Sequence, residues 1–155
     1  MDMNIPTVLK TITDSGSALS AITGWWKKAK GDSRAVIGEL KDNMSYLEMV
    51  DEDGVELGNV IDKISVDEFK RLAKEGFNFN TLKKDKISQL ALIEGSDLSS
   101  WNGKTTEELI ESIYDKIIEL KIRYPHLQKN AKYRWNARVI NIRKRIWLLF
   151  KHIGS

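Results

Sequence analysis

Residues 131–153 read AKYRWNARVINIRKRIWLLFKHI, and this stretch contains the clearest structural pattern in the chain. Apolar side chains recur in it at alternating spacings of four and three residues, namely Trp135, Val139, Ile142, Ile146, Leu149 and Ile153. This spacing places them in one line along a helix, as in a heptad seam. We therefore predict a long final helix, from about Ala131 to Ile153, whose apolar side packs inside the protein.

The segment before this helix predicts a second long one. Thr105-Thr106-Glu107-Glu108 has the spacing of a capping box, in which a hydroxyl and a carboxylate three residues apart bind the free amides at a helix start. An apolar side follows, formed by Leu109, Ile113, Ile117, Leu120 and Tyr124. We expect Pro125 to end this helix, because proline lacks an amide hydrogen. The two long helices should then form an antiparallel hairpin.

The N-terminal third also has helical periodicity. A first helix is expected from about Thr7 to Lys30, where Gly31 breaks it, and Asp32 is a good N-cap for the next. The second helix buries one apolar side, formed by Val36, Ile37, Leu40, Met44, Leu47 and Val50. The acidic run Asp51-Glu52-Asp53-Gly54 should be the loop that follows it.

The middle of the chain predicts shorter elements. Ser65 and Glu68 have the spacing of another capping box, and the helix they open should stop at Gly76. A further short helix is expected over 82–93, followed by a polar loop over 96–104. Since no run alternates with the period of a strand, we predict an all-α fold, a helical bundle forming one domain over residues 1–155.

Composition excludes several classes of site. The chain has no cysteine, so no disulfide or thiolate site can form, and this composition fits a cytoplasmic protein. With only two histidines we expect no metal site, and without a glycine-rich phosphate loop we expect no cofactor. We expect no signal peptide, because the N-terminus has no basic region followed by an apolar core, and no membrane span, because no apolar run approaches ~18 residues. We expect no membrane partner either, because the first helix is too polar for strong insertion.

Charge is distributed unevenly along the chain. The formal net charge of the whole chain is +3. Residues 121–155 contain ten Lys or Arg and no Asp or Glu, so this segment has a charge of +10. Subtracting ten from +3 leaves −7 for residues 1–120. We single out the basic residues of the last helix and its connection as contact residues for nucleic acid or another partner: Lys132, Arg134, Arg138, Lys144, Arg145 and Lys151. Clustered cations bind phosphates, and the interleaved Tyr133, Trp135 and Trp147 could stack on unpaired bases.

The alternative is that these charges are paired within the protein. Glu108, Glu111 and Asp115 recur at helical spacing on the preceding helix and could face the basic helix across the hairpin. The aromatic residues would then belong to the core, as Trp135 does if the seam is buried. The sequence leaves open whether the basic helix is exposed or paired in this way.

One pair of residues resembles a known catalytic motif. Arg145 and His152 are separated by six residues and lie two turns apart on one side of the last helix. This resembles the Arg-x(4–6)-His motif of the HEPN superfamily, whose members are α-helical and include RNases of toxin and antiphage systems. The resemblance implies that His152 moves a proton while Arg145 stabilises a phosphate. Ile146 departs from the pattern, since a polar residue usually follows the arginine.

Three functional hypotheses result. The first is a non-catalytic helical interaction module that binds a protein partner or another copy of itself, with the basic helix as its contact surface. The second is an RNA-binding protein that uses the same basic residues. The third is a HEPN-like, metal-independent RNase of a toxin or defence system, with Arg145 and His152 as its catalytic pair.

Overall fold

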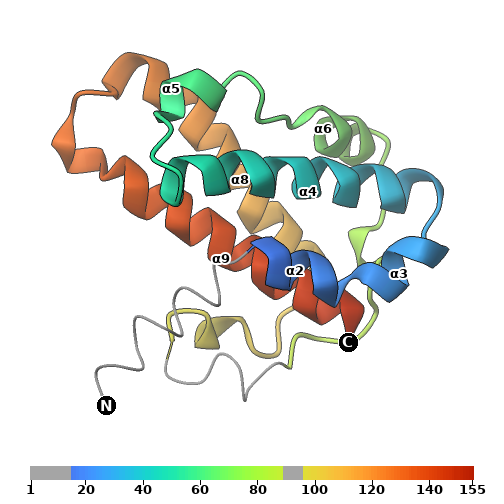
Figure 1. Cartoon of the computed structure of the whole chain (residues 1–155). Helices are drawn as coiled ribbons and strands as arrows, with labels where there is room; N and C mark the ends of the chain where they lie inside the picture. Colours follow the sequence, from blue (N-terminus) through green and yellow to red (C-terminus); the bar gives the residue numbers. More distant parts are fainter. Residues whose placement is uncertain (1–14, 89–95) are drawn as a thin grey trace, which may run out of the picture.

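The computed structural model describes residues 15–88 and 96–155, and the described part contains helices and no strand (Figure 1). The helices are α2 (Ser15–Ala21), α3 (Thr23–Lys28), α4 (Gly31–Asp51), α5 (Leu57–Val60), α6 (Asp67–Lys74), α8 (Thr106–Leu127) and α9 (Trp135–Gly154). Short 3₁₀ turns cover Phe79–Thr81, Ser99–Trp101 and Ala131–Tyr133. The prediction of an all-α helical bundle is confirmed.

Helix α9 is the centre of the bundle, and its neighbours α2, α4 and α8 pack around it (Figure 1). These helices pack against the predicted seam of α9, whose residues Val139, Ile142, Ile146, Leu149 and Ile153 are all buried. Trp135, the first seam residue, is half-buried. Toward the C-terminal end the seam widens, since Trp147, Leu148 and Phe150 are buried as well, so this end of α9 is enclosed on several sides.

Helix α8 runs antiparallel to α9 and begins as predicted. The hydroxyl of Thr105 accepts from the amide of Glu108, and the carboxylate of Glu108 accepts from the amide of Thr105, which completes the capping box. The prediction that Pro125 ends the helix is wrong, because α8 continues to Leu127. Proline here removes one amide in the last turn, which leaves the remaining backbone bonds of a long helix in place.

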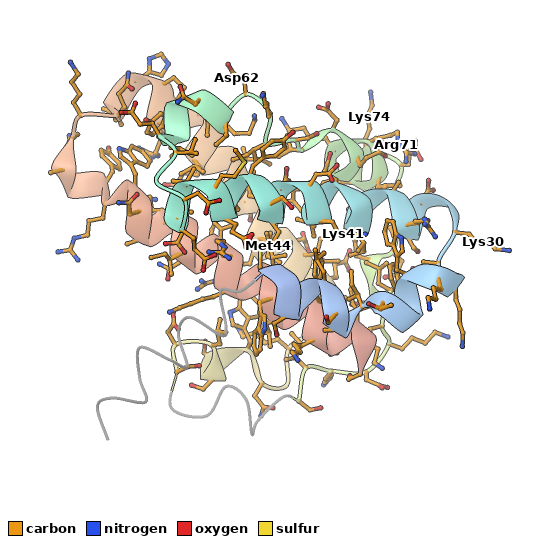
Figure 2. The ribbon with its side chains drawn as sticks, in the orientation of Figure 1. Lys30, Lys41, Met44, Asp62, Arg71 and Lys74 are labelled. Carbon is orange, nitrogen blue, oxygen red and sulfur yellow. The ribbon has the colours of Figure 1, made fainter. Side chains whose placement is uncertain are left out.

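The N-terminal helices differ from the prediction. The expected helix over 7–30 is interrupted at Ile22, which has φ −102° and ψ 6° and is buried, so α2 and α3 are separate. The part of that prediction over 7–14 lies outside the described residues. Asp32 is not the N-cap of α4, because Lys30 holds that position. The Asp32 carboxylate instead lies 3.1 Å from the Arg71 guanidinium of α6, which Figure 2 labels.

The start of α6 is capped by a residue from another helix. The sequence predicts that Ser65 caps the amide of Glu68, but that amide donates to the carboxylate of Glu39 on α4, at 2.9 Å. The same carboxylate accepts from the Phe69 amide at 3.2 Å and from the Tyr114 hydroxyl of α8 at 2.8 Å. Glu39 therefore ties three helices together at one buried point.

The segment between α6 and α8 is irregular where it is described. The short helix expected over 82–93 does not form over 82–88, and 89–93 lie outside the described residues. The Ile87 amide donates to the carbonyl of Lys104, and its carbonyl accepts from the amide of Gly103. These two bonds, together with the buried Ile87 side chain, fasten the segment beside the start of α8.

The end of α9 approaches α2 more closely than any side chain would allow. A Cβ atom at Gly154 would lie 1.8 Å from the carbonyl oxygen of Ala21. Beside it, Lys83 donates to the carbonyl of Ser155 at 2.6 Å. The C-terminal end of α9 is therefore packed into the fold, and the opposite end of the α8–α9 hairpin projects away from it (Figure 1).

Candidate functional site

The basic residues of α9 separate into two groups, and the first is bound by carboxylates inside the fold. Arg143 is fully buried and faces three acidic side chains at the end of α4. Its guanidinium lies 2.7 Å from Asp51, 3.8 Å from Glu48 and 3.7 Å from Glu52. This residue fixes α9 against α4 and is not available to a partner.

Three neighbours toward the C-terminus are also engaged. Lys144 pairs with Asp97 at 3.1 Å. Arg145 donates to the backbone carbonyl of Asn141, and burial lowers its pKa from the ordinary value. Lys151 is half-buried and lies over the ring of Trp147, 5.8 Å from its centroid. Of the six residues singled out from the sequence, these three therefore face the fold.

The predicted carboxylate partners are not used in the described part of the chain. Glu108, Glu111 and Asp115 are exposed on α8, and among the described residues no ion pair joins them to α9. Partial desolvation of its carboxyl group, together with the like charges of its acidic neighbours on α8, raises the pKa of Glu111. The acidic side of α8 thus faces solvent, and the partners of the α9 cations come from α4, from Asp97 and from Glu119.

The second group of cations lies at the tip of the hairpin. Lys129, Lys132 and Arg134 are exposed, and no carboxylate pairs with them in the ranges that the structure describes. Arg134 has φ 46° and lies between the 3₁₀ turn and the first residue of α9. A left-handed backbone conformation is uncommon for residues other than glycine, and such residues cluster at active sites and ligand clamps.

Two stacked aromatic rings form the centre of this tip. The rings of Tyr133 and Trp135 are nearly parallel, with 5.2 Å between centroids, and Tyr124 of α8 meets Trp135 edge-on at 5.3 Å. The indole nitrogen of Trp135 donates to the Leu127 carbonyl at 3.2 Å, which anchors the stack to α8. Tyr133 is half-exposed, so its ring remains partly accessible.

Arg138 holds the stack in position from α9. It donates to the Tyr133 carbonyl at 2.7 Å, and its guanidinium lies 3.4 Å from Glu119 of α8. Its guanidinium carbon also lies 5.4 Å from the ring centroid of Tyr133 and 5.7 Å from that of Trp135. Arg138 is therefore a positioning residue at the tip. We call the residues of this region the tip surface: Lys129, Lys132, Tyr133, Arg134, Trp135 and Arg138.

Two hollows flank the tip surface, and Arg134 borders both. One, of about 510 Å³, lies on the side of Trp135 and α5. The other, of about 380 Å³, lies on the side of Tyr133 and Arg138. Either could receive a flat group beside the rings while the cations reach a neighbouring anion.

The structure places Arg145 and His152 apart from this surface. His152 is 2% exposed, and its Nε2 atom lies 2.9 Å from the hydroxyl of Thr106 on α8. Seven residues along a helix correspond to roughly 10 Å of axial rise, which separates the two side chains along α9. His152 serves as a buried contact between α9 and the start of α8, and Arg145 binds its own helix.

Burial of His152 predicts a dependence of stability on pH. Burial lowers its pKa below the ordinary value of about 6.5, and the nearby charge of Lys83 acts in the same direction, opposed by Asp85. Below about 6.5 the unfolded chain therefore binds a proton that the folded protein does not. We expect the free energy of unfolding to fall as the pH is lowered from about 7 toward 5.

Urea unfolding followed by tryptophan fluorescence measures this effect at each pH. In His152→Gln, the free energy of unfolding should fall less as the pH is lowered. His126 is exposed, so His126→Gln should show the same pH dependence as the wild type. If the free energy of unfolding of His152→Gln fell as steeply with pH as that of the wild type, the His152 ring would not be the source of the pH dependence.

Two residues of the tip region were not in the set of contacts chosen from the sequence. Lys129 is exposed before the 3₁₀ turn, and Arg123 lies at the end of α8 with its guanidinium carbon 5.9 Å from the Tyr133 ring centroid. Both belong to the basic segment 121–155, so charge alone could have included them. Only the fold shows that Arg123 lies beside Tyr133.

Comparisons with protein-family models, with curated proteins and with solved structures find no match for this chain. The described residues contain no cluster of His, Asp and Glu suited to hold a metal ion. In the same ranges, none of the helices has the length and apolar character needed to cross a membrane.

Proposed function

We propose that this protein is a non-catalytic binding module and that the tip surface is its contact site. One observation supports this choice above the others. The cations toward the C-terminal end of α9 are engaged within the fold, whereas Lys129, Lys132 and Arg134 are exposed and unpaired by carboxylates in the described part of the chain. Exposed charges that no carboxylate neutralises are available to a partner. Lys132 lies 5.7 Å from the ring centroid of Tyr133, but its side chain is exposed, whereas that of Lys151 is half-buried.

The chemistry of the tip surface favours a polyanion with flat groups, and single-stranded RNA is the partner we propose. Phosphates gain affinity from exposed Lys and Arg through the release of counterions. An aromatic platform beside these cations can stack an unpaired base, and Tyr133 offers a half-exposed ring held in place by Trp135 and Arg138. An acidic protein segment would use the cations without needing the ring.

Binding to a labelled single-stranded RNA, followed by fluorescence anisotropy, tests the proposal. The triple variant Lys129→Gln, Lys132→Gln, Arg134→Gln removes the unpaired cations and leaves Arg138 and the ring stack intact. We expect it to bind at least about tenfold more weakly at low salt, because three phosphate contacts are lost. Tyr133→Ala should weaken RNA binding by an amount corresponding to one stacked base, about 1–3 kcal/mol.

A matched control is available at the opposite end of the molecule. Lys27, Lys28 and Lys30 are exposed near the end of α3, and changing all three to glutamine alters the net charge by the same amount. This control should bind RNA nearly as well as the wild type. Equal weakening in both triple variants would show that net charge alone governs binding, and unchanged affinity in the tip variant would exclude the tip surface.

A further inference from the structure

The two hollows beside the tip surface differ in charge. Among the described residues, four cations and one carboxylate border the hollow on the side of Tyr133, namely Lys116, Lys132, Arg134, Arg138 and Glu119. This carboxylate is already engaged by Arg123 at 3.2 Å and by Arg138 at 3.4 Å. The hollow on the side of Trp135 has one charge of each sign, Arg134 and Glu56, and no ion pair joins these two described residues. An anion is therefore attracted more strongly to the hollow beside Tyr133.

The hollow beside Trp135 has walls suited to a flat, uncharged ring. The rings of Tyr124 and Trp135 and the side chains of Val55 and Leu57 border it. Trp135 is fixed there by its hydrogen bond to the Leu127 carbonyl and by its edge-on contact with Tyr124. A hollow of about 510 Å³ with such walls has room for a nucleobase, which has an apolar face to lay against them.

Three polar side chains border the same hollow and make no hydrogen bond or ion pair within the described part of the chain. They are the amides of Gln128 and Asn136 and the carboxylate of Glu56, and all three are exposed. A side-chain amide presents a donor and an acceptor side by side, which matches the amino group and a neighbouring ring nitrogen of adenine. A carboxylate only accepts, so Glu56 also favours an amino group and repels the carbonyl oxygen that uracil has in its place.

We propose that the hollow beside Trp135 binds an unpaired adenine base of the RNA strand, and that the hollow beside Tyr133 holds the neighbouring phosphates. Arg134 borders both hollows, so it lies where the phosphate between two nucleotides would pass. Cytosine also has an amino group, but adenine is larger and covers more of the ring surface. The inference rests on the proposed RNA-binding function and adds a preference for one base to it. Tyr133 can stack a base of any kind, whereas Gln128, Asn136 and Glu56 select one.

Binding of two labelled strands at low salt, followed by fluorescence anisotropy, tests this selection. One strand is a short oligouridylate, and the other has the same length with one adenosine at its centre. We expect the wild-type chain to bind the strand with adenosine at least about fivefold more tightly, because one amide–adenine contact gives discrimination of that order. The double variant Gln128→Ala, Asn136→Ala should bind both strands nearly equally and keep the wild-type dependence on salt. Both residues are exposed, so the helical circular dichroism should not change.

Three single variants separate base recognition from phosphate binding. Glu56→Gln introduces a group that can donate to a uracil carbonyl, so the preference for adenosine should narrow. Lys132→Gln should weaken both strands alike and make the salt slope shallower by about 0.7, the value for one phosphate contact on a single strand. The control Asn102→Ala removes an exposed amide from the loop before α8 and should leave the preference unchanged.

Equal binding of the two strands by the wild type would overturn the adenine site and leave the RNA-binding proposal in place. A preference for adenosine that persists in the double variant would also overturn the site, because the base would then be recognised elsewhere. Binding of neither strand would contradict RNA binding itself, and the adenine site with it.

Discussion

Arg143→Met is expected to lower the free energy of unfolding by about 3–5 kcal/mol, the cost of removing one partner from a buried ion pair. Arg143 is fully buried, and the acidic side chains of Glu48, Asp51 and Glu52 surround its guanidinium. Methionine fills much of the same volume, so the loss comes from the three carboxylates left without their cation. Chemical denaturation followed by tryptophan fluorescence measures it.

The chain contains a matched control for this variant. Arg71 also has three carboxylate partners, Asp32, Glu68 and Glu75, but it lies on the surface of α6, where Figure 2 labels it. Its side chain is 43% exposed, and solvent screens such pairs. Arg71→Met should therefore cause only a small fraction of the loss seen in Arg143→Met. Equal losses would mean that the number of carboxylate partners, and not burial, determines the effect.

Glu39→Ala should lower the free energy of unfolding by roughly 2–4 kcal/mol, because buried donors lose their acceptor. The carboxylate accepts from the amides of Glu68 and Phe69 and from the hydroxyls of Tyr114 and Ser65. Alanine leaves the buried Tyr114 hydroxyl without this acceptor and the first turn of α6 without its cap. Burial, with the nearby charge of Glu39, raises the pKa of this tyrosine well above the ordinary value.

Two further variants separate the cap from general effects on α4. Asp42→Ala alters an exposed carboxylate one turn away on the same helix and should have little effect. Glu39→Gln keeps one acceptor oxygen and should give an intermediate loss. If Glu39→Ala and Asp42→Ala lowered the free energy of unfolding equally, the hydrogen bonds of Glu39 would not explain how α4, α6 and α8 are joined.

The two long helices could be predicted because their signals are local. The seam spacing in 131–153 and the capping box at Thr105 depend only on residues a few positions apart, and both are present in the structure. The cap of α6 could not be predicted in the same way. Ser65 and Glu68 have the right spacing, but the fold brings Glu39 to that helix start from 29 residues earlier.

The charged contacts were harder to predict than the helices. Arg143 belongs to the basic segment 121–155, and the sequence leaves open whether this segment is exposed; the structure buries Arg143. A weak signal existed, because Phe150 lies seven residues further on and widens the apolar side of α9 toward Arg143. Its partners on α4 depend on how the two helices dock, which no short-range pattern records.

The candidate surface was predicted only in part. Lys132, Arg134 and Arg138 were singled out from charge alone, and the structure places all three at the tip of the hairpin. Lys144, Arg145 and Lys151 belonged to the same charge run, but the rotation of α9 turns them toward the fold. The spacing of Arg145 and His152 resembled a catalytic motif, while their contacts are with Asn141 and Thr106.

The most direct test of the tip surface is a titration of the wild-type chain with a labelled single-stranded RNA at low and at physiological salt. We predict saturable binding whose logarithmic affinity falls linearly with the logarithm of salt concentration, with a slope of about −2 for three phosphate contacts on a single strand. No binding even at low salt would contradict the proposed RNA-binding function.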